Sequence, residues 1–226
     1  MKAMISLCDL TGNMAKPWRK AGYECILVDP QHSKDENYRY AADRLFRRND
    51  GMLCFAGTIE QFMLMHLLEV EQDFDVQFVA CFPPCTDLAV SGARWFKAKS
   101  EKNPHFQADA MRLVYQCKQV AETVNAPYFI ENPVSRISTL WRKPDYSFHP
   151  YEFTGYEPSD NYTKKTCLWT GNGFRMPHKN QDLSLGEPDD RIHKAGPSED
   201  RANFRSATPM GFAQAVFEFN HKEATP

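Results

Sequence analysis

Apolar, strand-like runs alternate with helical stretches over the first two-thirds of the chain, and this alternation constrains the fold most. We predict strands at residues 3–10, 24–30, 52–57, 75–82 and 126–132. A short helix is expected over residues 14–22, a second follows Thr58, and apolar residues recur at helical spacing over 104–125. This order favours an α/β fold with a doubly wound parallel sheet, in which helices cover both faces.

The remainder of the chain is less regular. The polar stretch at 33–51 is expected to be partly helical, and residues 164–172 contain a sixth strand. Residues 173–204 have little periodicity and are predicted to form an irregular segment. Ser206 or Thr208 is expected to cap a final helix, with Pro209 in its first turn. With 226 residues, the chain suits a single α/β domain over 1–226.

Composition excludes several classes of protein. The formal net charge is -2, so a globally basic nucleic-acid binder is excluded, although a local basic face is not. Apolar runs stay well short of the ~20 residues that span a membrane, and the first residues do not have the pattern of a signal peptide. The seven cysteines are scattered without a CxxC pair, which favours free thiols in a reducing cytoplasm over disulfides or a metal site.

Chemically capable side chains follow the predicted strands. Asp9, Asp29, Cys85 and Glu131 with Asn132 each stand where a predicted strand ends. Because ligands of doubly wound sheets bind beyond the carboxyl ends of the strands, we expect these residues to share one edge of the sheet.

Cys85 lies directly beyond the strand at 75–82, in the run "FPPC". A nucleophilic cysteine acts through its thiolate and needs exposure, which a loop position allows and a strand interior does not. A phosphatase-type loop needs Cys and Arg closer together than the eight residues between Cys85 and Arg94. A cysteine protease needs a partner histidine, and no histidine of the sequence stands out in that role.

Glu131 follows a buried strand in "YFIENP". Removal of a carboxyl group from water disfavours its charged form, so we expect the pKa of Glu131 to be raised. A carboxylic acid of this kind can donate a proton or a hydrogen bond near neutral pH.

The run "CDLTGN" combines a strand with a tight turn at Gly12, and Asp29 stands 20 residues after Asp9. A glycine turn lets a ligand approach the backbone, and an acidic residue at the next strand end accepts hydrogen bonds from ribose hydroxyls. One glycine in place of three argues against a dinucleotide and favours a nucleoside cofactor without phosphates.

In this order, the motifs resemble those of the cytosine-5 DNA methyltransferases, especially small forms seen in phages and prophages. The matching runs are "DLTGN", "PPCTDLAVSG", "ENP", "TKKTCLW" and "RSATPMGFAQAV", which together extend over nearly the whole chain. The resemblance implies a Rossmann-like S-adenosylmethionine-dependent methyltransferase fold, S-adenosylmethionine as methyl donor, and a cytoplasmic location in a bacterial or phage-infected cell.

The resemblance also implies roles for individual residues. Cys85 would add to carbon 6 of the cytosine and Glu131 would hold ring nitrogen 3, with Ser91 beside them and Lys165 orienting the base. The residues expected to hold the cofactor are Asp9, Leu10, Thr11, Gly12, Asp29, Pro30, Thr58, Pro83 and Thr208. Those expected to contact the base or DNA are Pro84, Asn132, Arg94, Lys97, Lys99 and Arg136. A base inside a duplex is out of reach of Cys85, so DNA would present a flipped cytosine under a loop at residues 87–102.

The chain departs from the family where a sizeable target-recognition domain usually lies, because only the short segment 173–204 is present. Relaxed sequence recognition, or a partner protein that supplies recognition, is therefore expected. Two alternatives to DNA methylation stay open. The chain could act on free pyrimidine nucleotides such as dCMP, or transfer a larger group from a modified donor. It could also be an inactive DNA-binding relative.

Overall fold

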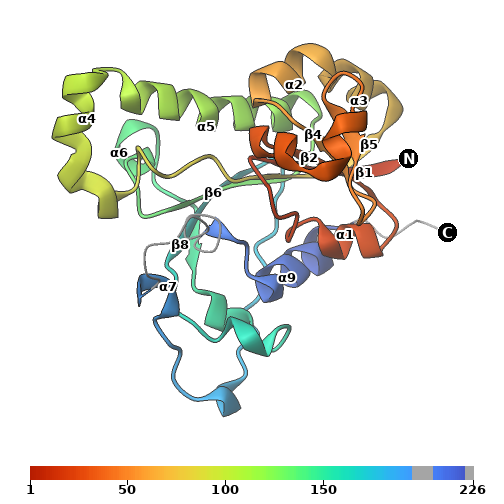
Figure 1. Cartoon of the computed structure of the whole chain (residues 1–226). Coiled ribbons are helices and arrows are strands. Elements are labelled where there is room, and N and C mark those ends of the chain that lie inside the picture. Colours follow the sequence, from red (N-terminus) through yellow and green to blue (C-terminus); the bar gives the residue numbers. More distant parts are fainter. Residues whose placement is uncertain (195–205, 222–226) are drawn as a thin grey trace.

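The computed structural model describes residues 1–194 and 206–221, which build one eight-stranded mixed sheet of order β3-β4-β2-β1-β5-β6-β8-β7 (Figure 1). The strands are β1 (Lys2–Leu7), β2 (Glu24–Val28), β3 (Leu45–Arg47), β4 (Leu53–Phe55), β5 (Asp75–Cys81), β6 (Tyr128–Pro133), β7 (Tyr146–Phe148) and β8 (Thr166–Gly171). The predicted α/β class is confirmed, and the sheet is compatible with a Rossmann-like fold.

The central strands β4, β2, β1, β5 and β6 are parallel, so their carboxyl ends meet at one edge. The strand order reverses between β1 and β5, which is the point where open α/β sheets bind ligands. At the two sides of the sheet, β3 runs antiparallel to β4, β8 to β6, and β7 to β8. These outer strands make the sheet mixed rather than purely parallel.

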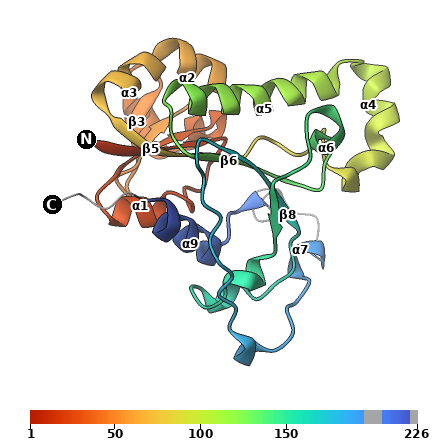
Figure 2. The same cartoon turned by 180° about the vertical axis from the view of Figure 1, so that it is seen from behind.

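Helices cover both faces of the sheet, as Figures 1 and 2 show from opposite sides. One face packs on α2 (Ile59–Met65), α3 (Leu67–Asp73) and α5 (Phe106–Thr123), and the other on α1 (Lys16–Lys20) and α9 (Met210–Asn220). In β1, Ile5 and Leu7 join the first core and Met4 joins the second. Burial on both faces explains the nearly continuous apolar runs of these strands.

The predicted helices form with shifted bounds. Thr58 caps α2 through a reciprocal pair of hydrogen bonds with Gln61, as its position predicts. The single helix expected there is interrupted at His66, where the backbone leaves helical geometry and α3 begins. Three further α-helices occur in the described part: α4 (Phe96–Lys102), α6 (Ile137–Leu140) and α7 (Arg191–Lys194).

Two short strands escaped prediction. The stretch at 33–51 forms the end of a 3₁₀ helix η1 (Pro30–Lys34), a second one, η2 (Glu36–Tyr40), and then β3. At the opposite edge, β7 pairs with β8. β3 and β7 are too short for their periodicity to be recognised, and neither lies in a continuous apolar run as β4 does. They form where a neighbouring strand offers them hydrogen bonds.

The predicted cap of the last helix is wrong. Pro209 itself is the N-cap residue of α9 and makes no side-chain cap hydrogen bond. Instead, the buried carboxylate of Asp160 accepts a hydrogen bond of 2.8 Å from the amide of Gly211. A residue distant in sequence therefore satisfies this helix end, a solution with no local sequence signal.

The described part of the irregular segment holds the 3₁₀ helix η6 (Leu183–Leu185) and α7, and residues 195–204 of it lie outside the described residues. A bilayer-spanning helix, long and apolar, does not occur among the residues described.

Phe212 of α9 provides a test of this packing. Its ring is buried and stacks on Phe148 at a centroid distance of 3.9 Å. We expect Phe212→Ala to lower the free energy of unfolding by about 3–5 kcal/mol in urea denaturation. Leu183→Ala is the control, since that side chain is 80% exposed and its loss should change stability by less than about 0.5 kcal/mol. Equal effects of the two substitutions would contradict the docking of α9 on the sheet.

Candidate active site

The sheet brings the predicted functional residues to one edge, in two groups. Asp9 and Asp29 follow β1 and β2, while Cys85 and Glu131 stand at the ends of β5 and β6. Cys81 pairs with Ile130, so Glu131 lies one residue past the last pair of β5 and β6. Neighbouring strands therefore carry the predicted nucleophile and the predicted acid.

Asp9 organises the glycine turn. Its carboxylate accepts hydrogen bonds from Ser6 Oγ at 2.7 Å, Thr11 Oγ1 at 3.0 Å and the amide of Gly12 at 2.8 Å. Because Asp9 is buried and these donors occupy it, its carboxylate shapes the loop rather than facing a ligand. This role differs from the direct cofactor contact expected for Asp9. Ser6, a polar residue inside an apolar strand, joins the residues that shape this loop.

Arg48 fastens the same turn from the β3–β4 connection. Its guanidinium donates to the carbonyls of Leu10 at 2.9 Å and Thr11 at 3.2 Å, and pairs with Asp50 at 2.7 Å. Gly12 has φ +72°, and a Cβ there would lie 2.7 Å from Arg48 Nη2. The missing side chain of Gly12 thus makes room for Arg48, where the sequence had suggested room for a ligand.

Asp29 and His32 join the ends of β1 and β2. Asp29 accepts a hydrogen bond of 2.7 Å from the amide of Gln31, and burial raises the pKa of its carboxyl. The ring of His32 lies 3.1 Å from the carbonyl oxygen of Asp9, and burial lowers its pKa. Asp29 is thus buried at the end of β2, with Oδ1 of its carboxylate bound to the amide of Gln31.

The other expected cofactor residues differ in exposure. Pro30 is exposed at the start of η1, and the Thr58 hydroxyl is engaged in capping α2. Thr208 is buried beside the glycine turn, where its carbonyl accepts a hydrogen bond of 3.1 Å from Asn13 Nδ2. The last segment of the chain therefore returns to the first loop.

The cysteine loop is held from β6. Pro83 is buried, Pro84 is exposed and Cys85 is half-buried. Asn132 donates from Nδ2 to the carbonyl of Pro83 at 2.9 Å and is itself fully buried. Asn132 was expected to bind substrate, but its place in the structure is that of a residue that positions the Pro-Cys loop.

A tight turn follows the cysteine. The Cys85 carbonyl accepts from the amides of Leu88 at 3.0 Å and Ala89 at 2.8 Å. None of the seven cysteines, all within the described residues, forms a disulfide. Burial raises the pKa of the thiols of Cys25 and Cys54 to about 12, which makes them unreactive.

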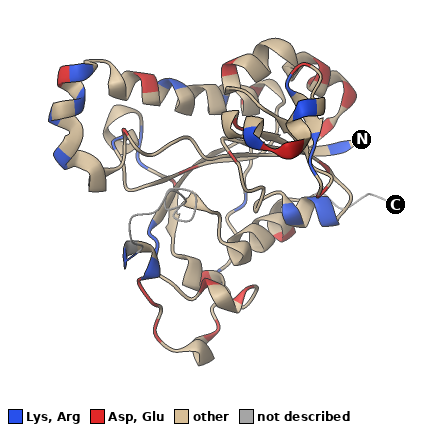
Figure 3. Cartoon of the chain, in the orientation of Figure 1, with Lys and Arg blue, Asp and Glu red and all other residues tan. Residues whose placement is uncertain are grey.

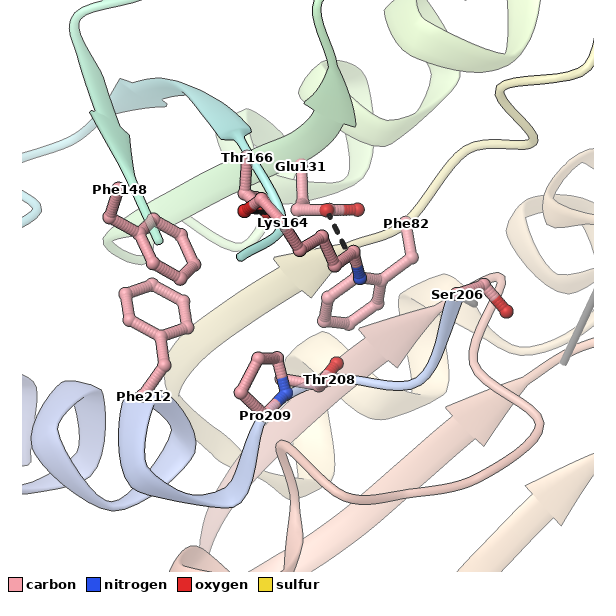
Figure 4. A pocket seen from close by; sticks show the side chains of 9 residues that line it. All are labelled: Phe82, Glu131, Phe148, Lys164, Thr166, Ser206, Thr208, Pro209 and Phe212. Carbon is pink, nitrogen blue, oxygen red and sulfur yellow. Dashed lines mark hydrogen bonds and ion pairs between the residues drawn. The ribbon is translucent and has the colours of Figure 1, made fainter. Parts of the chain in front are cut away.

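Glu131 lies in a hollow at the end of β6. Its side chain is 15% exposed, and burial raises the pKa of its carboxyl as predicted. Lys164 Nζ lies 4.0 Å from Glu131 Oε1 and opposes this shift (Figure 4). Lys165, the expected cation of the site, is exposed, so the neighbouring Lys164 takes the position beside Glu131. The sequence alone does not show which of these two adjacent lysines lies beside Glu131.

Aromatic rings and the C-terminal segment complete this hollow. Phe82, Phe148 and Phe212 line it together with Thr166, Ser206, Thr208 and Pro209, as Figure 4 shows. Because Thr208 also contacts the glycine turn through Asn13, the hollow lies between the two groups of site residues.

The cations expected to contact DNA have different surroundings. Ser91, Arg94 and Lys97 are exposed on a 3₁₀ helix, η3 (Val90–Trp95), and on α4. Lys99 donates to Asp87 Oδ1 at 2.6 Å and to the carbonyl of Thr86, so it fastens the loop. Arg136 is exposed next to the site.

Three cations in the described part of the irregular segment form ion pairs with carboxylates. Lys179 pairs with Glu152 at 2.9 Å, and Arg191 and Lys194 pair with the nearby Asp189 and Asp190. This part of the chain therefore presents less free positive charge than its composition suggests.

Neither a scan against models of known protein families nor a search of curated proteins finds a match to this chain. Its function is therefore argued from the geometry of the site.

The contact between Gly12 and Arg48 is testable by stability. We expect Gly12→Ala to lower the free energy of unfolding by more than Gly173→Ala. Both glycines have positive φ, which costs an alanine about 1–2 kcal/mol, but a Cβ at Gly173 meets no atom within 4 Å.

Urea denaturation of both variants, each also combined with Arg48→Ala, isolates the contact. Removal of the guanidinium should reduce the cost of Gly12→Ala and leave that of Gly173→Ala unchanged. Equal costs in the presence of Arg48 would show that the guanidinium does not press on Gly12.

Proposed function

We propose that this chain is an S-adenosylmethionine-dependent methyltransferase that modifies carbon 5 of cytosine in DNA through a covalent adduct with Cys85. The observation that carries the proposal is the placement of Cys85 and the buried Glu131 at the ends of the adjacent parallel strands β5 and β6. A cysteine nucleophile beside a carboxylic acid of raised pKa is the pair that addition to a pyrimidine ring requires.

Cys85 begins the reaction as a thiolate. Its sulfur forms a bond to carbon 6 of the ring, and the electron pair displaced from the ring double bond moves toward carbon 5 and ring nitrogen 3. Glu131 donates its proton to nitrogen 3, so the negative charge does not accumulate in a site that is poorly solvated. Carbon 5 then becomes nucleophilic.

Burial keeps Glu131 able to act as this acid. A carboxyl group with an ordinary pKa is almost wholly ionised at neutral pH, whereas desolvation raises the pKa of Glu131 and so increases the fraction of molecules that carry this proton. Lys164 Nζ, 4.0 Å from Glu131 Oε1, limits the rise of this pKa. It thereby helps Glu131 to release and recover the proton.

The donor supplies an electrophilic methyl group for carbon 5. The residues at the ends of β1 and β2 fit its nucleoside part, because the Asp29 carboxylate can accept hydrogen bonds from ribose hydroxyls. Asp9 and Arg48 hold the loop of residues 10–12 in place beside it. Release requires loss of the carbon 5 proton to a base. The bond from carbon 6 to sulfur then breaks, nitrogen 3 returns its proton to Glu131, and Cys85 leaves as a thiolate.

DNA is the favoured substrate because the segments that follow Cys85 and Glu131 carry exposed cations. Arg94, Lys97 and Arg136 lie on the segments that follow β5 and β6. The paired cations of the irregular segment support relaxed recognition of sequence.

Product analysis tests this function. Purified protein is incubated with S-adenosylmethionine and duplex DNA, single-stranded DNA or dCMP, and the nucleosides are analysed by mass spectrometry. We expect 5-methylcytosine in DNA and none with Cys85→Ala. Product from dCMP alone would indicate a nucleotide enzyme, and a larger added mass would indicate a modified donor. Absence of product together with no binding of S-adenosylmethionine in calorimetry would indicate an inactive relative, and methylation by Cys85→Ala would refute the mechanism.

The different positions of Lys164 and Lys165 lead us to predict different effects of their replacement on the pH dependence of methyl transfer. Because protonated Glu131 is the active form, the rate falls as pH rises through its pKa. Lys164→Met removes the cation that lowers this pKa, so the falling limb of the pH–rate profile should move to higher pH. Lys165→Met, the control, should leave the limb in place because Lys165 is exposed. Equal shifts in both variants would contradict the assignment of Lys164.

Glu131→Gln separates catalysis from stability. We expect a loss of methyl transfer of about 10²–10⁴-fold, the range for a general acid. The raised pKa means that the folded protein binds the proton more tightly than the unfolded chain. Stability therefore falls as pH rises through the interval between the two pKa values. At neutral pH the glutamine variant should melt at the same temperature as wild type or higher, and a large drop in melting temperature would show that Glu131 is mainly structural.

A further inference from the structure

The segment that follows the cysteine loop contributes nothing to the core. From Val90 to Asp109 no side chain is buried. Residues 90–102, here called the arm, comprise η3 and α4 and lie at the outer end of α5, away from the sheet (Figures 1 and 2). Stability of the fold therefore does not account for the residue types found there.

An exposed tryptophan stands on the arm. Trp95 is 56% exposed, whereas Trp18 and Trp169 are fully buried. The guanidinium of Arg94 lies 5.1 Å from the centroid of the Trp95 ring. An exposed indole offers a large apolar face to solvent. An exposed indole and an adjacent cation together can bind a nucleic acid strand, the ring by stacking on a base and the cation by its charge.

The charge of the arm is positive. Its residues include Arg94 and three lysines against the single acid Glu101, and Figure 3 shows these lysines along α4. Within the described part of the chain, Arg94, Lys97 and Lys102 form no ion pair, whereas Lys99 is held by Asp87. The unpaired cations suit the phosphates of a strand that lies along the arm.

Backbone hydrogen bonds hold the root of the arm. The amide of Val90 donates to the carbonyl of Val134 at 3.0 Å, and that of Arg136 to the carbonyl of Leu88 at 2.8 Å. These bonds fix the root of the arm against the segment that follows Glu131. A strand bound by the arm is thereby led toward the site.

We propose that Trp95 stacks on an unpaired nucleobase and that the arm binds single-stranded nucleic acid next to the Cys85 site. This deepens the proposed function and rests on it for the identity of the reaction. A stacking platform needs a free base face, which a duplex covers. A duplex would also be held from a second side, yet Lys179, Arg191 and Lys194 of the irregular segment are tied to carboxylates.

Binding is measured without cofactor, by fluorescence anisotropy of a labelled single strand of about 12 nucleotides. Trp95→Ala should weaken binding by about 10-fold or more, and Trp95→Phe should retain most of the affinity because it keeps a ring. Tyr40→Ala is the matched control, since Tyr40 is an exposed ring with the guanidinium of Arg39 4.8 Å from its centroid, on η2. It should bind as wild type does.

Two further readouts test stacking and charge separately. Intrinsic fluorescence should be quenched when the strand binds, and this quenching should disappear in Trp95→Phe although binding remains. Lys97→Gln should leave the quenching intact and reduce the salt slope of binding by about 0.7, the value for one phosphate contact on a single strand.

The outcomes distinguish this inference from the proposed function. If binding depends on Trp95 but the protein transfers no methyl group, single-strand binding by the arm is confirmed and the proposed methyltransferase activity is rejected. Unchanged affinity of Trp95→Ala, or tighter binding of a duplex of the same sequence, would overturn the inference even if methylated DNA is formed.

Discussion

Burial of both faces of the parallel strands is the constraint on which the rest of this structure depends. Helices pack on each side, so the strand interiors are apolar and the main places left for polar side chains are the strand ends. Since the five central strands run in the same direction, their carboxyl ends gather carboxylates and a thiol along one edge. The chemistry of the site is therefore a consequence of the way the core is built.

The same burial sets the properties of the site groups. Glu131 lies within β6, where it pairs with Leu168 of β8. Aromatic rings and the C-terminal segment shield it from water, and this burial raises its pKa without a neighbouring negative charge. Asp29 is shifted in the same direction by the same cause. Lys164 is the cation that opposes this shift, so the pKa of Glu131 is set by desolvation first and by charge second.

Long-range hydrogen bonds turn the strand ends into shaped loops. Arg48 holds the glycine turn, His32 joins the ends of β1 and β2, and Asn132 ties the Pro-Cys loop to β6. Each bond links residues at least 23 positions apart, and each satisfies a backbone carbonyl that would otherwise lack a partner at the edge. The arm differs from these loops because it is bonded only at its root and through Lys99, which leaves Trp95 and the other cations of the arm on the surface.

The sequence by itself determined the α/β class, the central strands, the cap at Thr58 and the positions of Asp9, Asp29, Cys85 and Glu131 at strand ends. Periodicity and local turn chemistry carry that information, because each signal lies within a few neighbouring residues. Only the tertiary structure decided that Lys164 rather than Lys165 adjoins Glu131, that Gly12 makes room for Arg48, and that Asp160 caps α9. These contacts join residues far apart in the chain, and nothing local in the sequence distinguishes the partner that packing brings close.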